Sequence, residues 1–309
     1  MPPGEAAAAE ARRRARRFPM GFPFRLFSRG EYTMSSLNEA AGRMLGPDDE
    51  ANVVLVHGWG GSARAWDGVR WPERWHAFAY ELPGHASRRN DGPFTIRHAT
   101  EGLAEFIRAK VAGSAERSLP TIVVAHSMGG QLSLLLNAEH PELLDGEVVI
   151  DPAYGAPDTP EEVAQHRADL AGLRERPYET MQRFLQGAFS PYLPDAARDA
   201  ILIDTGRTNP QSLADYYYDE YLSDHEIGLY PATKLVAVRR GRPVLGIYRT
   251  PDRAEMEESL NAGVQPCRTE AWGGEHGHYL QLEEPDRLVS SVVAWAGEFV
   301  PAARQAVLA

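Results

Sequence analysis

Short, mostly apolar runs recur along the chain from about residue 50, and stretches with hydrophobic positions at helical spacing separate most of them. Continuous apolar runs of this length, rich in Val and Ile, are typical of parallel strands buried on both faces. Alternating strands and helices predict an α/β fold with a doubly wound, mostly parallel sheet, whose ligand site lies at the carboxyl ends of the strands. The predicted strands are 52–56, 77–80, 121–125, 147–150, 243–248 and 268–272.

Helical periodicity is clearest in 95–112, where apolar side chains recur every three or four residues and predict a helix packed on the sheet. Further helices are predicted over 132–139, 254–260 and 285–299. The second of these segments follows a strand directly, and the last closes the chain. These elements assign 36–152 and 237–309 to one core domain.

The strand and helix alternation stops between 153 and 236. This segment holds helix-like stretches at 160–174, 178–189 and 213–222, with aromatic residues scattered through them. An insertion rich in helices over the carboxyl ends of the strands would act as a cap on the ligand site. We therefore expect 153–236 to form a helical cap over the ligand site.

The first 35 residues differ in composition from the rest, with seven arginines against three glutamates. Any helix there would present little more than alanine on its apolar side. We expect residues 1–35 to be a disordered N-terminal extension, with Met34 as an alternative start. An Arg-rich targeting peptide is the competing interpretation, although no continuous apolar segment supports secretion.

Charge and cysteine usage narrow the class of protein further. The chain has 32 Lys and Arg against 43 Asp and Glu, a net charge of −11, which argues against nucleic acid and anionic membranes as partners. No apolar run approaches the roughly 20 residues that a membrane helix needs. Cys267 is the only cysteine, so no intrachain disulfide can form. A reducing, cytoplasmic location is expected on that ground.

The strand 121–125 leads into a candidate nucleophile elbow. Ser127 stands between Ala125 and Gly129, and a helix follows. An elbow needs small residues two positions before and after the nucleophile because the neighbouring backbones nearly touch. Ala125 replaces the usual glycine, and the same pattern also occurs in ordinary strand-to-helix turns. Whether Ser127 is catalytic therefore depends on which residues stand beside it as base and acid.

A serine hydroxyl needs a general base, and the base needs an acid that orients it. His278 lies in a loop after the last predicted strand, and Asp252 lies just past the strand that ends at 248. Asp151 also ends a strand and is the alternative acid. The chain order serine, aspartate, histidine is that of the α/β-hydrolases.

From about residue 50 the chain resembles the α/β-hydrolase superfamily of serine esterase type. The resemblance rests on six motifs in order: His57-Gly58-Trp59-Gly60, Pro83-Gly84-His85, His126-Ser127-Met128-Gly129-Gly130, His140-Pro141-Glu142, Asp151-Pro152, and Gly277-His278 with Glu284-Pro285. It implies that Ser127 is the nucleophile, His278 the base and Asp252 the acid. Asp252 is preferred to Asp151 because it stands nine residues past Pro243, the spacing of the family pattern.

The resemblance also implies an oxyanion hole built from the backbone N–H groups of Trp59 and Met128. His276 competes with His278 as base or contacts substrate, and Tyr217 is a candidate substrate contact. Of three consecutive tyrosines on a helix, no more than two can face the same way. The remaining histidines of the motifs, His57, His85 and His126, are expected to bond neighbouring loop backbones.

Neither metal-ligand spacing nor a phosphate loop or dinucleotide fingerprint occurs in the sequence, so neither a metal nor a cofactor is expected. The expected function is hydrolysis of a carboxylic ester or lactone, a small-molecule substrate, through an acyl-enzyme. A carbon–carbon bond hydrolase of the same fold and a non-catalytic ligand receptor are the alternatives. The sequence leaves the oligomeric state open.

Overall fold

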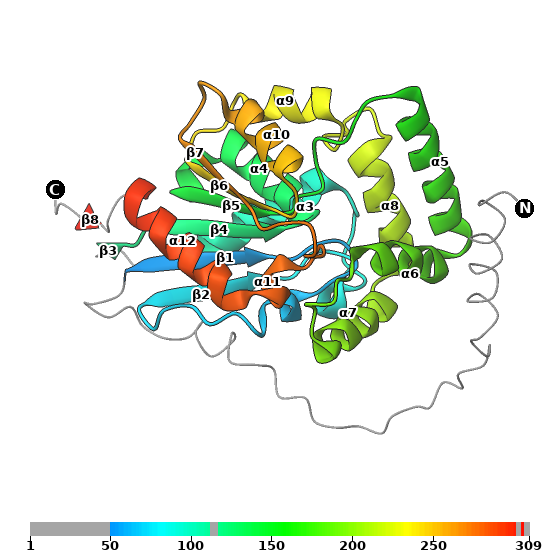
Figure 1. Cartoon of the computed structure of the whole chain (residues 1–309), viewed down its shortest axis with the longest axis horizontal. Coiled ribbons are helices and arrows are strands. Elements are labelled where there is room, and N and C mark those ends of the chain that lie inside the picture. The colour runs from blue at the N-terminus through cyan, green and yellow to red at the C-terminus, as the bar shows by residue number, and fades with distance from the viewer. Residues whose placement is uncertain (1–49, 112–116, 301–303, 306–309) are drawn as a thin grey trace, which may run out of the picture. The chain divides into compact units, whose positions relative to one another are not determined.

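A parallel sheet forms the centre of the computed structural model, which describes residues 50–111, 117–300 and 304–305 (Figure 1). Within these residues the sheet has six strands in the order β2-β1-β4-β5-β6-β7, and every adjacent pair is parallel. The α/β fold with a doubly wound sheet is thereby confirmed. The strands are β1 (Ala51–Val56), β2 (Trp75–Tyr80), β4 (Thr121–His126), β5 (Gly146–Ile150), β6 (Val244–Tyr248) and β7 (Cys267–Ala271).

Helices cover both faces of the sheet. One face packs against α3 (Ile96–Phe106), α4 (Gly129–Glu139), α9 (Tyr230–Ala237) and α10 (Pro251–Asn261), and the other against α11 (Leu280–Glu283) and α12 (Pro285–Phe299). Figure 1 shows α12 crossing the sheet on the near side. Shorter elements are η1 (Ala63–Trp66), η2 (Ala86–Arg88), the π-helical turn η3 (Ile107–Val111), η4 (Pro141–Leu143), and the pair β3 (Arg117–Ser118) and β8 (Arg304–Gln305).

The two faces explain why the strands read as continuous apolar runs. In β1, Val53 and Leu55 join the core beneath α12, while Val54 and Val56 join the core beneath α3 and α4. All four side chains are fully buried. Successive side chains of a strand point to opposite faces, so a sheet covered on both sides needs apolar residues at every position.

Five helices lie between β5 and β6. One of them, α9, packs on the sheet, and we call the other four the inserted helices: α5 (Pro160–Glu175), α6 (Pro177–Ala188), α7 (Asp195–Arg207) and α8 (Pro210–Tyr221). Figure 1 shows them grouped at one end of the sheet. They share a separate apolar core that includes Leu173, Leu185 and Leu213. Thr159 and Asn209 cap α5 and α8 by accepting backbone N–H bonds, and a proline follows each cap in the first turn, where its missing N–H costs nothing.

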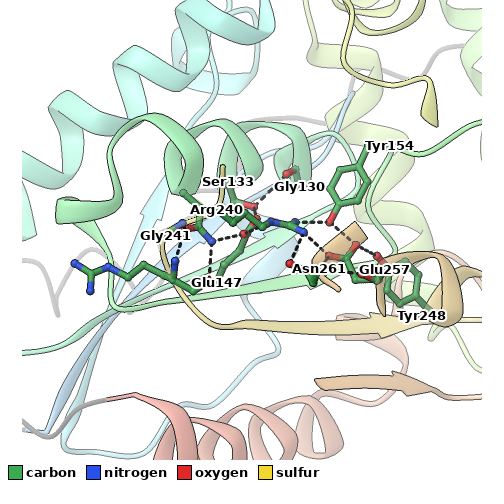
Figure 2. Close-up of polar contacts among 11 residues, drawn as sticks. Gly130, Ser133, Glu147, Tyr154, Arg240, Gly241, Tyr248, Glu257 and Asn261 are labelled. Carbon is green, nitrogen blue, oxygen red and sulfur yellow. Dashed lines mark hydrogen bonds and ion pairs between the residues drawn. The ribbon is translucent and has the colours of Figure 1, made fainter. Parts of the chain in front are cut away.

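A buried polar network links β5 and β6 to the helices α4 and α10 (Figure 2). At its centre Arg240, whose side chain is fully buried, donates to Glu257 at 2.6 Å and to the Tyr154 hydroxyl at 2.9 Å. Its Nε lies 3.0 Å from Glu147 on β5. One guanidinium thus neutralises two carboxylates that burial would otherwise make very costly.

The rest of the Arg240 network satisfies the remaining oxygens. Ser133 on α4 donates to Glu147 at 2.7 Å, and Tyr248 at the end of β6 donates to Glu257 at 2.6 Å. Asn137 and Asn261 complete it. Burial raises the pKa of Glu257, but Arg240 and the two tyrosine hydroxyls lower it by more, so the group stays ionised. The network therefore fixes α4, β5, β6 and α10 relative to one another.

Residues 1–49 lie outside the described part of the chain, and with them the predictions for the N-terminal extension and for Met34. Among the helices that are described, none is long and apolar enough to cross a lipid bilayer.

Candidate active site

Ser127 follows β4 directly and takes a left-handed backbone conformation, with φ +55°. Its N–H donates to the Ile150 carbonyl at 3.1 Å, and its own carbonyl accepts from Gly130 at 2.8 Å. A positive φ is strained for a residue with a side chain and persists where surrounding contacts enforce it. This strand–turn–helix geometry is that of a nucleophile elbow.

Close backbone approach around the elbow explains its small residues. A Cβ atom at Gly129 would lie 2.7 Å from the carbonyl oxygens of Val56 and His57 on β1 and the loop after it. At Gly58 it would lie 2.8 Å from the Ser127 Cβ. Ala125 is completely buried, so its methyl fits where the usual pattern has glycine. The elbow therefore depends on glycine at two positions from different loops.

The carboxylate that contacts His278 is that of Asp151. His278 Nδ1 donates to Asp151 Oδ2 at 2.6 Å. Asp151 follows β5, the strand next to β4, and His126 pairs with Ile150 across the two strands. Ser127 and Asp151 therefore leave neighbouring strands at the same level. Charge-assisted hydrogen bonds of this length are strong and fix the imidazole orientation.

The preference for Asp252 in the sequence analysis is corrected by this contact. Asp252 lies in the first turn of α10 with an exposed side chain. The Thr250 hydroxyl and then the backbone N–H groups of its own helix lower the pKa of its carboxyl. Because Pro251 begins a helix straight after β6, Asp252 lies on the surface of α10 rather than facing His278.

The surroundings of Asp151 keep its carboxylate ionised. Burial raises the pKa of Asp151, but the hydrogen bond and charge of His278 and the guanidinium groups of Arg249 and Arg253 lower it by more. Arg249 Nε lies 2.7 Å from Asp151 Oδ2, the same oxygen that His278 contacts. The net pKa lies below the ordinary value, as a carboxylate that orients a histidine requires.

His278 is also fixed through its backbone. Its N–H donates to the Ala188 carbonyl at the end of α6, at 2.8 Å, and its carbonyl accepts from His126 Nε2 at 2.8 Å. Burial, and then the charge of His278, lower the pKa of His126 to about 3. His126 is thus a neutral donor, and the prediction that it bonds a loop backbone is confirmed.

His57 and His85 hold the loop after β1 in the same manner. His85 Nε2 accepts from the Gly60 N–H at 3.0 Å, and its Nδ1 donates to the Pro83 carbonyl at 2.9 Å. Burial lowers the pKa of His85 to about 3, so the ring keeps one acceptor nitrogen at neutral pH. His57 Nδ1 contacts the Gly58 carbonyl at 2.9 Å. Both predicted backbone roles are confirmed.

Of the two candidate substrate contacts, Tyr217 lines the cavity and His276 does not. His276 Nε2 lies 2.7 Å from Glu284, and its ring stacks on Tyr192, outside the cavity described below. Tyr217 lines that cavity, and its hydroxyl bonds His166 at 2.8 Å. Of the neighbouring tyrosines, Tyr216 is fully buried and Tyr218 is exposed. The expectation that the three could not share one direction is confirmed.

A cavity of about 910 Å³ joins the elbow to the inserted helices. Ser127, Asp151 and His278 line it, as do Trp59 and Met128, and each inserted helix contributes to its wall. Apolar side chains such as Met181, Phe184 and Ile201 form much of that wall. Among the residues that the structure describes, no group of three or more His, Cys, Asp or Glu side chains could hold a metal ion.

Sequence reasoning missed two polar residues of the cavity wall. Glu220 on α8 is buried, accepts from Gln131 Nε2 at 2.8 Å, and has its pKa raised to about 8 by burial. Arg249 follows β6 directly and faces Asp151. An acidic residue within a polar helix carries no signal of burial. Arg249, in contrast, stands at a strand carboxyl end, a place where side chains reach the ligand site.

A sequence model of the alpha/beta hydrolase family matches residues 53–291. The chain belongs to this family. It is similar over 98 residues to a pimeloyl-[acyl-carrier protein] methyl ester esterase of Neisseria meningitidis (strain MC58), with 35% identity, covering 31% of this chain and 34% of that protein. It is also 32% identical to the esterase Rv0045c of Mycobacterium tuberculosis over 137 residues, 43% of this chain and 44% of the relative.

The matched region therefore spans less than half of each relative, and these relatives are esterases. Two solved structures share the fold. Est816, described as an N-acyl homoserine lactone degrading enzyme, has a TM-score of 0.61 at 17% identity, covering 79% of this chain and 93% of its own. A bromoperoxidase from Bacillus anthracis has a TM-score of 0.65 at 14% identity, covering 80% and 92%. Family membership and esterase relatives support a hydrolytic enzyme.

Proposed function

We propose that this protein is a serine hydrolase that cleaves carboxylic esters, lactones included, through an acyl-enzyme and without a cofactor. The observation that carries the proposal is the 2.6 Å contact between His278 Nδ1 and Asp151 Oδ2 in the cavity that the elbow serine also lines. In this proposal Ser127 is the nucleophile, His278 the general base and Asp151 the orienting acid.

In the first half-reaction, His278 Nε2 accepts the Ser127 hydroxyl proton while Oγ attacks the ester carbonyl carbon. Negative charge then develops on the carbonyl oxygen. The backbone N–H groups of Trp59 and Met128 would donate to it, and within the described chain neither group has another acceptor. Donors that are placed before the reaction stabilise this charge without reorganisation, and one such donor is typically worth about 10²- to 10³-fold in turnover.

The tetrahedral intermediate collapses when the ester C–O bond breaks and His278 gives its proton to the leaving alcohol oxygen. With a lactone, the new hydroxyl stays attached to the acyl group. Water then attacks the acyl-enzyme, with His278 again as base, and the Ser127 hydroxyl is regenerated as the carboxylic acid leaves. Asp151 remains ionised throughout and stabilises the imidazolium that forms at each attack.

Cavity size and lining support a substrate with a sizeable apolar group. About 910 Å³ exceeds the volume of a simple acetyl ester, and the residues of α6 and α7 along the wall are mainly apolar. We assign the inserted helices, within 153–236, the role of a cap that encloses this group. Excluding water around the carbonyl would strengthen the electrostatic contacts that form during attack.

The proposed cellular location rests on two observations, the free cysteine and the net charge. Cys267 is a free cysteine, and the charge balance of −11 opposes anionic membranes as partners. We place the enzyme in the cytoplasm on that basis.

A fluorophosphonate probe tests the proposal directly. The protein is incubated briefly with the probe, its intact mass is measured, and any adduct is mapped to a peptide. One adduct on Ser127, absent in His278→Ala, is expected because phosphonylation needs the base and the oxyanion donors together. Turnover of aryl esters and lactones should follow. Absence of an adduct on the folded protein would instead favour a ligand receptor built on this fold.

A labelled Ser127 without turnover of any ester or lactone would favour the carbon–carbon bond hydrolase. The same triad serves both reactions, so the labelling experiment alone does not separate them. An ester panel with graded acyl length, from acetate to decanoate, covers the volume range that the cavity admits. Its control is Ser127→Ala, in which both labelling and turnover should be lost.

A further inference from the structure

Three neighbouring strands each end in a chemically distinct side chain. Ser127 follows β4, Asp151 follows β5, and Arg249 follows β6. Asp151 donates its N–H to Ile247 on β6 at 2.8 Å, so the ends of β5 and β6 are tied together. Arg249 reaches back across this junction to Asp151, with Nε 2.7 Å from Oδ2. The sequence analysis took the acid, Asp252, from the end of β6, but the residue that reaches the site from there is the cation Arg249.

We propose that Arg249 is a positioning residue for the hydrolytic reaction. Its guanidinium holds the Asp151 carboxylate in place and thereby helps to set the acid limb of the pH–rate profile. The inference rests on the proposed function, in which Asp151 orients His278. The supporting geometry is that the cation and the imidazole share one carboxylate oxygen, Oδ2.

Among the charged groups that face Asp151, Arg249 is the one placed to hold its carboxylate. Asp151 is 5% exposed, and the charged and titratable groups that face it are His278, Arg249, Arg253 and His126. Burial holds His126 neutral, its pKa lowered to about 3, so it adds no charge above pH 5. Arg253 donates to the carbonyls of the loop that follows Asp151, including Tyr154 at 2.6 Å. Arg253 is therefore committed to the loop backbone.

The direction of the effect follows from the charges. The Asp151 carboxylate stabilises protonated His278, and a cation on the same oxygen offsets part of that stabilisation. His278 must be neutral to accept the Ser127 proton. With Arg249 present, we therefore expect the enzyme to work further into the acid range. Removing the cation should move the acid limb of kcat/KM upward in pH.

The expected movement is about 0.5 to 1 pH unit, because an adjacent charge shifts titration by about 1 to 3 units when desolvated and by less when water screens it. The Arg249 side chain is 38% exposed, which places it in the screened regime. Arg249→Lys keeps the charge on a shorter, more mobile group and should move the midpoint by less than half as much.

The test compares the wild-type protein with Arg249→Gln, Arg249→Lys and Arg97→Gln. Arg97 pairs with Glu139 at 2.6 Å between α3 and α4, so its replacement removes an arginine from an ion pair away from the cavity. The His278 ring is titrated by NMR, with its signal assigned from His278→Gln, and kcat/KM for an aryl ester is measured from pH 4 to 9. Thermal unfolding checks the fold of each variant.

An upward movement of the His278 midpoint and of the acid limb of kcat/KM in Arg249→Gln, with none in Arg97→Gln, supports the proposal. An unmoved midpoint in folded Arg249→Gln overturns it. A change confined to KM for anionic esters also overturns it, since Arg249 would then bind substrate. If the wild-type protein hydrolyses no ester but the NMR midpoint moves, the electrostatic role stands while the proposed function fails.

Discussion

Ser127 and Asp151 occupy the same level at the ends of two adjacent strands, and both have left-handed backbones, with φ +55° and +40°. Neither is glycine, so each turn is strained and is maintained by its neighbours. The backbone N–H groups of both residues bond to the next strand of the sheet, at Ile150 and Ile247. The sheet register itself therefore sets the spacing between these two side chains.

The first prediction separates the two candidate acids. Asp151→Asn should lower kcat/KM for an aryl ester by about 10⁴-fold, because the amide no longer fixes the productive tautomer of His278. Asp252→Asn should stay within about twofold of wild type, since its exposed carboxylate bonds only the start of α10. Steady-state kinetics decide the matter, and equal losses in the two variants would contradict the assignment.

The second prediction concerns the close contact between Gly58 and Ser127. Gly58→Ala places a methyl carbon 2.8 Å from the Ser127 Cβ, so the loop or the serine must move. A displacement near 1 Å should lower kcat by about 10²-fold, with a smaller effect on folding.

Gly68→Ala is the matched control for that variant. Gly68 also lines the cavity, but among the described atoms a Cβ there meets nothing within 4 Å. Its kcat should equal that of the wild-type protein. Similar losses at positions 58 and 68 would mean that the close contact with Ser127 is unimportant.

The third prediction follows from Glu220, whose pKa burial raises from 4.5 to about 8. Between these values the unfolded chain has lost this proton while the folded protein keeps it, so this group makes stability fall as pH rises from 4.5 to 8. In Glu220→Gln the contribution disappears. The variant should therefore gain stability relative to wild type between pH 5 and pH 8, on the order of 3 kcal/mol.

Urea unfolding at both pH values measures this difference. Comparing the variant with the wild-type protein at each pH cancels the contributions of all other titrating groups. A pH-independent difference would show that Glu220 is ionised in the folded protein.

The fourth prediction concerns the Arg240 network of Figure 2. Arg240→Met leaves Glu147 and Glu257 buried without their cation, and breaking a buried pair in this way costs about 3–5 kcal/mol of unfolding free energy. Arg239→Met is the control, because Arg239 is half exposed and its nearest carboxylate, on Glu139, is 3.5 Å away. That change should stay within about 0.5 kcal/mol. Urea unfolding at pH 7 measures both.

The sequence predicted the sheet well because strands buried on both faces leave a strong apolar signal. Strand 121–125 corresponds to β4, and strand 243–248 to β6, each within one residue at either end. The helices α7 and α9 were missed. In α7 the apolar residues do not form one face, since Leu202 and Ile203 are exposed, so no helical period stands out. The core that stabilises α7 comes from other segments of the chain.

The sequence predicted those site residues that belong to a short motif. Ser127 and His278 stand in loops whose pattern survives in the sequence, and the structure places both in one cavity. Asp252 was preferred for its distance from Pro243, but spacing along the chain does not record that a helix begins at Pro251. Contacts across strands, such as Asp151 with His278 and Arg249, depend on register, which a single sequence does not specify.

Asp151, the proposed acid, precedes the inserted helices in the chain, and this order has a consequence for how the family can diversify. Ser127 and Asp151 both come before residue 152, on strands joined by α4 and η4, whereas much of the cavity wall comes from the insertion that follows. The insertion can lengthen, shorten or be exchanged without altering the spacing of nucleophile and acid. Because the backbone of His278 bonds to Ala188 at the end of α6, a library randomised over α7 alone should yield new selectivities while the contact between His278 and Asp151 is kept.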